Sequence, residues 1–129
     1  QSFHLVITLN VLDNAMLPLL YRRMSESKRR KAAYEVLERM EMTHRLRHYP
    51  QQLSGGQCQR VAIARAIVGN PEIILADEPT DSKMGAEVMS ILHRLNTEDG
   101  RTIVMVTHNE LQARETSRTI RMFDGHQVG

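Results

Sequence analysis

Two short apolar runs, one on each side of a helical pattern, constrain the fold of this chain more than any other feature. Residues 73–76 read Ile-Ile-Leu-Ala between a turn sequence and two acids, and residues 102–107 read Thr-Ile-Val-Met-Val-Thr. Such runs are typical of buried strands in a parallel sheet. The residues between them repeat on one helical face: Val88, Ile91, Leu92 and Leu95. The order strand, helix, strand predicts an α/β fold with a mainly parallel sheet.

Three further helices are predicted before the first strand. Residues 11–20 fit a short helix that is broken at Pro18. Ser25 is a candidate N-cap for a second helix, because the apolar residues after it repeat on one face: Ala33, Val36, Leu37 and Met40. A third helix, at about 56–68, is apolar almost all round and is therefore predicted to be deeply packed. The sequence Gly-Asn-Pro at 69–71 should end it.

The C-terminal part continues the alternation of helices and strands. A short helix is predicted from about 109 to 117, and a third strand at 119–123. Asp124 and Gly125 form a hairpin turn signal directly after that strand.

The composition excludes several classes of protein. With 129 residues, the chain has the length of one domain or of a piece of one. A net charge of +2 and the absence of Trp argue against a dedicated nucleic-acid binder. The basic runs at 22–23 and 28–31 are interpreted as a solvated helix face. A single cysteine, Cys58, excludes an intrachain disulfide and suits a reducing compartment. The sequence opens on Gln1 rather than Met, and we expect both ends to be cut.

The stretch Leu-Ser-Gly-Gly-Gln at 53–57 predicts an anion site at the start of the third helix. Gly55 and Gly56 allow the backbone to approach a ligand closely, and Ser54 is a plausible N-cap. The helix that follows adds the positive end of its dipole, which favours a phosphate group. No GxxxxGK[ST] loop, which would complete such a site, occurs in the sequence.

Polar residues follow both predicted strands at their carboxyl ends, where ligands bind in open α/β sheets. Asp77 and Glu78 follow the first strand, and His108 follows the second. Asp77 suits a Mg²⁺ ion and Glu78 suits a general base that positions water. The alternative is that the two acids cap the next helix and that His108 is structural. The remaining histidines have no metal-ligand spacing with Cys58 and are interpreted as surface or packing residues.

Taken in order, these motifs resemble the nucleotide-binding domain of ABC transporters, over nearly the whole chain. LSGGQ at 53–57 resembles the signature loop, IILADEPT at 73–80 resembles Walker B with its catalytic glutamate, and VTH at 106–108 resembles the switch-histidine strand. Gln1 resembles the Q-loop glutamine. NAMLPLLY at 14–21 and HYPQQLSGGQ at 48–57 are similar to ATPases of the macrolide-export and lipoprotein-release type.

The resemblance implies a role for each matching residue. Gln1 would contact Mg²⁺ and the attacking water, Asp77 would orient Mg²⁺, Glu78 would be the general base and His108 would sense the γ-phosphate. The signature residues would bind ATP held by the opposite subunit: Ser54, Gly55, Gly56 and Gln57. The fold implied is a P-loop NTPase-like sheet (71–129) with a helical signature subdomain (1–70) that docks on a transmembrane permease. The protein would be a homodimeric, peripheral ATPase at the cytoplasmic face of the membrane.

Two departures from the family pattern affect these expectations. Everything before the Q-loop is absent, including the P-loop, so we expect the 129-residue chain to bind ATP poorly and not to turn it over. Loss of the P-loop strand should leave the strands near 73 and 102 adjacent. It should also remove the strand that we expect in the sheet between the strand at 102 and the strand at 119. Thr80 also runs directly into Asp81, where the family has about three more residues. We align Asp81 with the D-loop aspartate, which a true deletion would misplace. Cys58 replaces a usually polar residue, with little expected consequence.

The leading hypothesis is therefore the C-terminal two-thirds of an ABC ATPase that hydrolyses ATP to drive an exporter or extractor. A soluble ABC protein acting on ribosomes or DNA is an alternative, which paired ABC domains or a long coiled-coil insertion would favour. A fragment that docks to a membrane subunit without catalysis is a further alternative.

Overall fold

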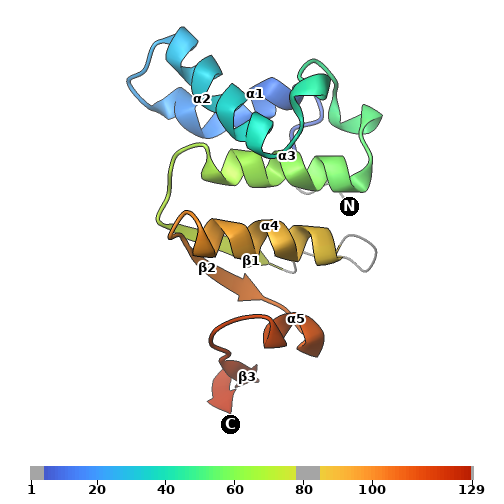
Figure 1. Cartoon of the computed structure of the whole chain (residues 1–129), viewed down its shortest axis with the longest axis vertical. Coiled ribbons are helices and arrows are strands. Elements are labelled where there is room, and N and C mark those ends of the chain that lie inside the picture. The colour runs from blue at the N-terminus through green and yellow to red at the C-terminus, as the bar shows by residue number, and fades with distance from the viewer. Residues whose placement is uncertain (1–4, 78–84, 129) are drawn as a thin grey trace.

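The computed structural model describes residues 5–77 and 85–128 of the chain, without the side chains of residue 77 and residues 85–87. Figure 1 shows a layer of helices at one end, a strand-helix-strand unit in the middle and a hairpin at the other end. The helices and 3₁₀ turns of the first part are α1 (Val11–Met16), η1 (Leu17–Tyr21), α2 (Glu26–Arg39), η2 (Thr43–Arg45), η3 (Pro50–Gln52) and α3 (Gly55–Ile67). The second part contains β1 (Ile73–Asp77), α4 (Gly85–Thr97), β2 (Thr102–Val106), α5 (Glu110–Arg114), β3 (Arg121–Phe123) and β4 (His126–Val128).

The helical layer packs α1, α2 and α3 around apolar side chains that belong to one core cluster with buried residues of β1 and α4. Ser25 is the N-cap of α2, as predicted, and its side chain accepts a hydrogen bond from the Lys28 N–H. The one-faced pattern of α2 is also confirmed, since Ala33 and Leu37 are fully buried. The α1 helix ends at Met16, just before the predicted break at Pro18. The core side chains that show almost no exposed surface are Val11, Ala15, Leu19, Ala33, Leu37, Met42, Val61 and Ala64.

A buried amide fixes the segment that leads into α1. Asn14 is fully buried, and its Oδ1 accepts a hydrogen bond from the Val6 N–H at 2.8 Å. Its Nδ2 lies 3.0 Å from the carbonyl oxygens of both Val6 and Leu9. These hydrogen bonds are part-buried, so one side chain satisfies backbone groups that would otherwise bind solvent. Asn14 therefore holds residues 6–10 against the helical layer.

The central unit is a parallel pair of strands covered on one face by α4. Ile73 pairs with Thr102 and Asp77 with Val106, so the predicted adjacency of the two strands is confirmed. On the covered face, Ile74 is buried. On the other face lie four exposed aliphatic residues, here called the open sheet face: Ile73, Leu75, Val104 and Val106. Their exposed fractions run from 46% at Val104 to 77% at Leu75. The prediction that residues 73–76 form a buried strand is thus wrong for this face, because no described element packs against it.

The third helix differs from its prediction in two respects. Its start and length are confirmed, but Ala66 is exposed, so the helix is not buried all round. It ends because Asn70, rather than Gly69, takes the left-handed conformation with φ of 57°. Gly69 has a different use. Its carbonyl accepts a hydrogen bond from Arg22 Nη2 at 2.9 Å, and a Cβ at Gly69 would lie 3.0 Å from the same nitrogen.

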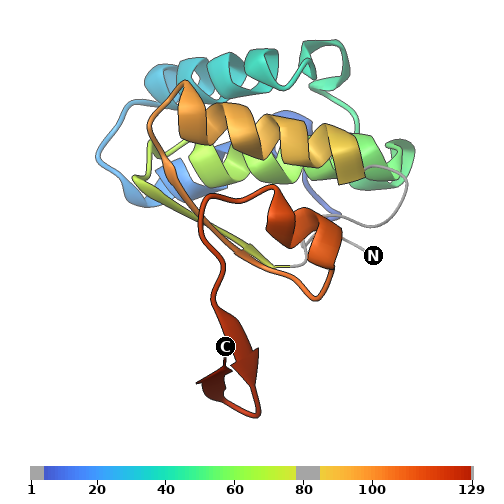
Figure 2. The same cartoon turned by 60° about the horizontal axis from the view of Figure 1, so that its bottom comes forward.

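The C-terminal segment forms a separate hairpin rather than a third strand of the parallel sheet. β3 and β4 pair with each other in antiparallel register, and Figure 2 shows the hairpin extending away from the remaining elements. The predicted turn is confirmed, since both Asp124 and Gly125 have positive φ, as a type I′ turn requires. The strand is shorter than predicted, and α5 ends at Arg114 rather than near residue 117.

An ion-pair network connects the helical layer to the central unit. Asp99 follows α4, and its Oδ2 lies 2.7 Å from Nη1 of Arg39 at the end of α2. Arg101 lies beside the same carboxylate, and its Nη1 donates to the Pro71 carbonyl at 2.6 Å. The guanidinium of Arg39 holds the pKa of Asp99 below its ordinary value, with a further contribution from Arg101.

Within the described ranges, no helix combines the length and apolar composition needed to cross a bilayer.

Candidate functional site

The glycine-rich turn at the start of α3 is a capped and exposed helix N-terminus. Ser54 is the N-cap, and its Oγ accepts a hydrogen bond from the Gln57 N–H at 3.1 Å. In return, Gln57 Oε1 accepts from the Ser54 N–H at 3.0 Å, which completes a capping box. Ser54 and Gly55 are exposed, whereas Gly56 and Gln57 are half-buried. We call residues 54–57 the signature turn.

This arrangement leaves backbone donors available to a ligand. The first N–H groups of a helix have no intrahelical acceptor, and the capping box uses that of Gln57. The N–H groups of Gly55 and Gly56 have no acceptor within the described part of the chain. Together with the dipole of a helix of 13 residues, they present a partial positive charge at the surface. The geometry therefore fits the predicted anion site.

The signature turn is anchored from behind by several contacts. The Cys58 thiol donates to the Pro50 carbonyl at 3.6 Å, and burial raises the pKa of this thiol. Further along α3, Arg60 Nη1 donates to the Met40 carbonyl at 2.7 Å, which ties the helix to the end of α2. Cys58 thus has a structural contact of its own at a position where we expected little consequence.

The carboxyl edge of the sheet brings two of the other predicted segments together. Asp77 and Val106 are paired in register, so the chain leaves both strands at neighbouring points of the edge. His108 is exposed there. The side chain of Asp77 lies outside the described part of the structure. The same holds for Gln1, Glu78 and Asp81, so their predicted roles stay predictions.

Two residues that support His108 were not predicted from the sequence. Thr107 Oγ1 accepts from the Asn109 N–H at 3.0 Å and donates to Gln112 Oε1 at 2.9 Å. Asn109 caps α5, because its Oδ1 accepts from the Leu111 N–H at 2.9 Å. The signal was present in the sequence, since Thr and Asn before a helical pattern favour such turns. These bonds fix the backbone on both sides of His108.

The structure does not bring the signature turn and the strand ends into one site. Figures 1 and 2 both place the start of α3 and the carboxyl ends of β1 and β2 toward the same side of the molecule, but in different layers. Among the described residues, no hydrogen bond or ion pair joins the signature turn to either strand. Among the described residues, the two predicted parts of the site therefore have no hydrogen bond or ion pair in common.

The family model and the relatives that match this chain all point to the same family. The family model described as ABC transporter matches residues 1–81. An uncharacterized ABC transporter ATP-binding protein of Methanocaldococcus jannaschii is 53% identical over 99% of this chain and 58% of its own length. The macrolide export ATP-binding/permease protein MacB of Bartonella henselae is 48% identical over 99% of this chain, which is 20% of that protein.

A solved structure shows the same fold. It is the dimeric, post-hydrolysis state of the ATP-binding cassette MJ0796 bound to ADP and Pi, with a TM-score of 0.80 and 51% sequence identity. The match covers 97% of this chain and 57% of the solved one. The chain thus spans somewhat more than half the length of the Methanocaldococcus jannaschii protein and of the solved cassette, and a fifth of MacB. The P-loop NTPase-like fold predicted from the sequence is confirmed.

The comparisons also bear on the short segment after Thr80. The alignment with the 53% identical relative extends over 131 residues, whereas this chain has 129. That relative therefore contains at least two residues with no counterpart here. The motif spacing predicts that they follow Thr80, directly before Asp81.

Proposed function

Since this chain belongs to the ABC transporter family of ATP-binding proteins, we propose that its full protein hydrolyses ATP at a dimer interface to drive export or extraction of a substrate. A transmembrane permease, in a separate chain or fused, would move the substrate at the cytoplasmic face of a membrane. The relatives support this proposal by their names, one being an ATP-binding/permease protein and one a cassette that is dimeric with ADP and Pi.

The observation that carries the proposal is the separation of the signature turn from the strand ends. An exposed, capped helix N-terminus is suited to a phosphate group. No described residue of the same chain completes that site. A second subunit that presents its own ATP would complete it, so Ser54, Gly55, Gly56 and Gln57 bind the γ-phosphate of ATP held by the partner.

The chemistry is assigned to the carboxyl edge of the sheet. A carboxylate at the end of a parallel strand suits Mg²⁺, which prefers oxygen ligands, so the position of Asp77 fits this ion. The ion, once bound, neutralises charge on the phosphates. Glu78 accepts a proton from the attacking water, and His108 contacts the γ-phosphate. Gln1 would contact the metal and the water, and Asp81 would contact the partner subunit. Thr107 and Asn109 position His108 through the bonds described above.

We assign the permease-docking surface to the helical part, residues 1–70, and the catalytic groups to residues 71–129. The 3₁₀ turn η1 exposes Leu20 by 52% and Tyr21 by 95%. An exposed aromatic side chain beside an exposed leucine is typical of an interface anchor. These two residues support the docking role, because α1 and α3 already bury the neighbouring Leu19.

The proposal is tested by Glu78→Gln in the full protein assembled with its permease. We expect phosphate release to fall by about two to four orders of magnitude, the usual contribution of a general base, while ATP binding persists. Glu35→Gln is the matched control, because Glu35 is an exposed acid on α2. Turnover that survives Glu78→Gln would show that Glu78 is not the base.

A further inference from the structure

The basic charge of this chain is concentrated in one short segment. Residues 22–31 contain six of the 17 basic residues and only one of the 15 acidic residues. Elsewhere acidic residues outnumber basic ones. Five of the six basic side chains are exposed and form what we call the basic patch: Arg22, Arg23, Lys28, Arg30 and Lys31.

Hydrogen bonds from Arg22 and from the neighbouring Arg29 to backbone carbonyls hold the patch in place. Arg29, the half-buried sixth residue, donates from Nη1 to the Met24 carbonyl at 2.7 Å and so fixes the loop before α2. Arg22 is anchored on the Gly69 carbonyl at the end of α3. Lys28 and Lys31 are three residues apart and share one face of α2. The loop and the first turns of the helix therefore present their charges together.

Helix stability does not explain this concentration. Cations are favoured near the C-terminus of a helix, yet residues 28–31 of α2 are all basic and lie in its first half. The acids Glu35 and Glu38 lie in its second half, although Glu26 and Arg39 follow the favourable order. Only Arg30 has an acidic partner, Glu26 at 2.8 Å, among the patch residues that the structure describes. The charge is thus available to an external anion.

The patch adjoins the surface that we assign to the permease. Arg22 and Arg23 follow the exposed Leu20 and Tyr21 directly. If those two residues contact a protein embedded in the bilayer, the patch lies beside that contact, close to the headgroups. Clusters of four or more basic residues next to a membrane-inserted element are typical of binding to anionic lipid.

We propose that the basic patch binds the anionic headgroups of the lipid that surrounds the permease. The proposal rests on the membrane-coupled function above. It adds a second contact, electrostatic rather than apolar, between the ATPase and the membrane. Lipid is favoured over nucleic acid because the patch has no array of aromatic residues for base stacking.

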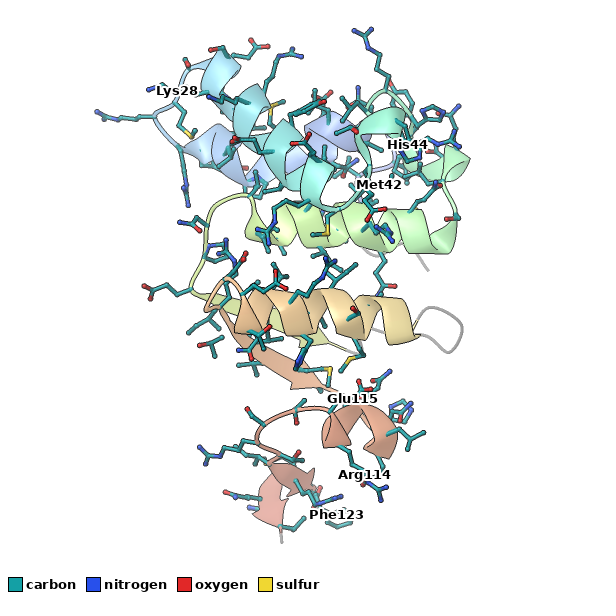
Figure 3. The ribbon with its side chains drawn as sticks, viewed as in Figure 1. Lys28, Met42, His44, Arg114, Glu115 and Phe123 are labelled. Carbon is teal, nitrogen blue, oxygen red and sulfur yellow. The ribbon has the colours of Figure 1, made fainter. Side chains whose placement is uncertain are left out.

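The test measures co-sedimentation of the full protein with vesicles of phosphatidylglycerol and phosphatidylcholine, and with vesicles of phosphatidylcholine alone. Lys28→Gln with Lys31→Gln should weaken binding to the anionic vesicles by about 25-fold, since each basic residue contributes about fivefold. Arg114→Gln with Arg118→Gln is the control with the same change of charge. Figure 3 places Lys28 and Arg114 toward opposite ends of the molecule. The control should change binding less than about twofold.

Three outcomes would overturn the proposal. Equal loss in the patch and control variants would indicate attraction by net charge alone. Equal binding to both kinds of vesicle would indicate an apolar contact. Unchanged vesicle binding with lost permease assembly in the patch variant would indicate an acidic surface of the permease as the partner. None of these three outcomes depends on ATP hydrolysis. ATP hydrolysis in detergent tests the proposed function separately.

Discussion

The helical layer and the strand-helix-strand unit bury their apolar residues to very different extents. In the helical layer, residues from α1, α2 and α3 are buried to the point that Leu37 and Val61 have no exposed surface. In the central unit, α4 covers one face of the sheet, while Leu75 on the opposite face is 77% exposed. Helices that pack on one another complete their own core, whereas a parallel sheet needs layers on both faces. The helical layer is thus complete within the described residues, and the sheet is not.

The difference in burial between the two regions is tested by replacing one leucine in each region of the 129-residue chain. Leu37→Ala should lower the free energy of unfolding by about 2–5 kcal/mol, because it leaves a cavity in a closed core. Leu75→Ala should change it by less than about 0.5 kcal/mol, because its side chain is already exposed to solvent. Urea unfolding followed by circular dichroism measures both. A cost at Leu75 as large as that at Leu37 would mean that the open sheet face is covered in solution.

A second comparison concerns buried and exposed amides. Asn14→Ala should cost about 1–3 kcal/mol, since it removes the acceptor of the Val6 N–H and a donor to the Leu9 carbonyl, both in part-buried hydrogen bonds. Asn96→Ala is the control, because exposed Asn96 donates a single hydrogen bond to the Arg101 carbonyl. Its cost should be about 1 kcal/mol or less. Equal costs in urea unfolding would contradict the structural role given to Asn14.

The cap of α3 allows stability to be separated from ligand binding. Ser54→Ala should cost about 1 kcal/mol through loss of the cap, as measured by thermal unfolding. Ser54→Asp keeps a capping oxygen and should unfold like the original chain. In the full protein, however, the added negative charge should weaken nucleotide-dependent dimerisation, measured by light scattering. If Ser54→Asp dimerises normally with ATP, the signature turn does not bind phosphate.

The smallest expected effect concerns the ion pair between the two regions. Arg39 lowers the pKa of Asp99, so the pair stabilises the fold above the ordinary pKa of an aspartate, near 4. This stabilisation is lost as the pH falls through the lowered pKa. Asp99→Asn should therefore unfold at lower urea than the original chain at pH 7, and the difference should vanish at low pH. Glu98→Gln, at an exposed neighbouring position, should show no such dependence.

The sequence predicted the helices and the two strands because their signals are local, whereas the pairing of these strands was predicted from the family resemblance. Ser25 and Ser54 each cap a helix, and residues 73–76 and 102–106 each form a strand of the parallel pair. These features depend on residues within a few positions of one another.

What the sequence could not predict depends on distant residues. The exposure of Leu75 reflects which elements lie over the sheet, and a strand's own residues do not encode this. β3 pairs with β4 instead of joining the sheet of β1 and β2, and the residues of β3 alone do not reveal this choice of partner. The contacts of Arg101 with Asn70 and Pro71 join positions about 30 residues apart, and no periodicity reveals them.

The central claim is that the signature turn serves the nucleotide of a partner subunit. It is tested most directly with two covalently linked copies of the full protein, by measuring ATP hydrolysis when Ser54→Asp and Glu78→Gln are combined in two ways. With both changes in one copy, an arrangement in trans damages both sites, so activity should fall to background. With one change in each copy, one site stays intact, so about half of the activity should remain. The opposite order, with more activity when both changes share a copy, would show that each chain completes its own site and would contradict the claim.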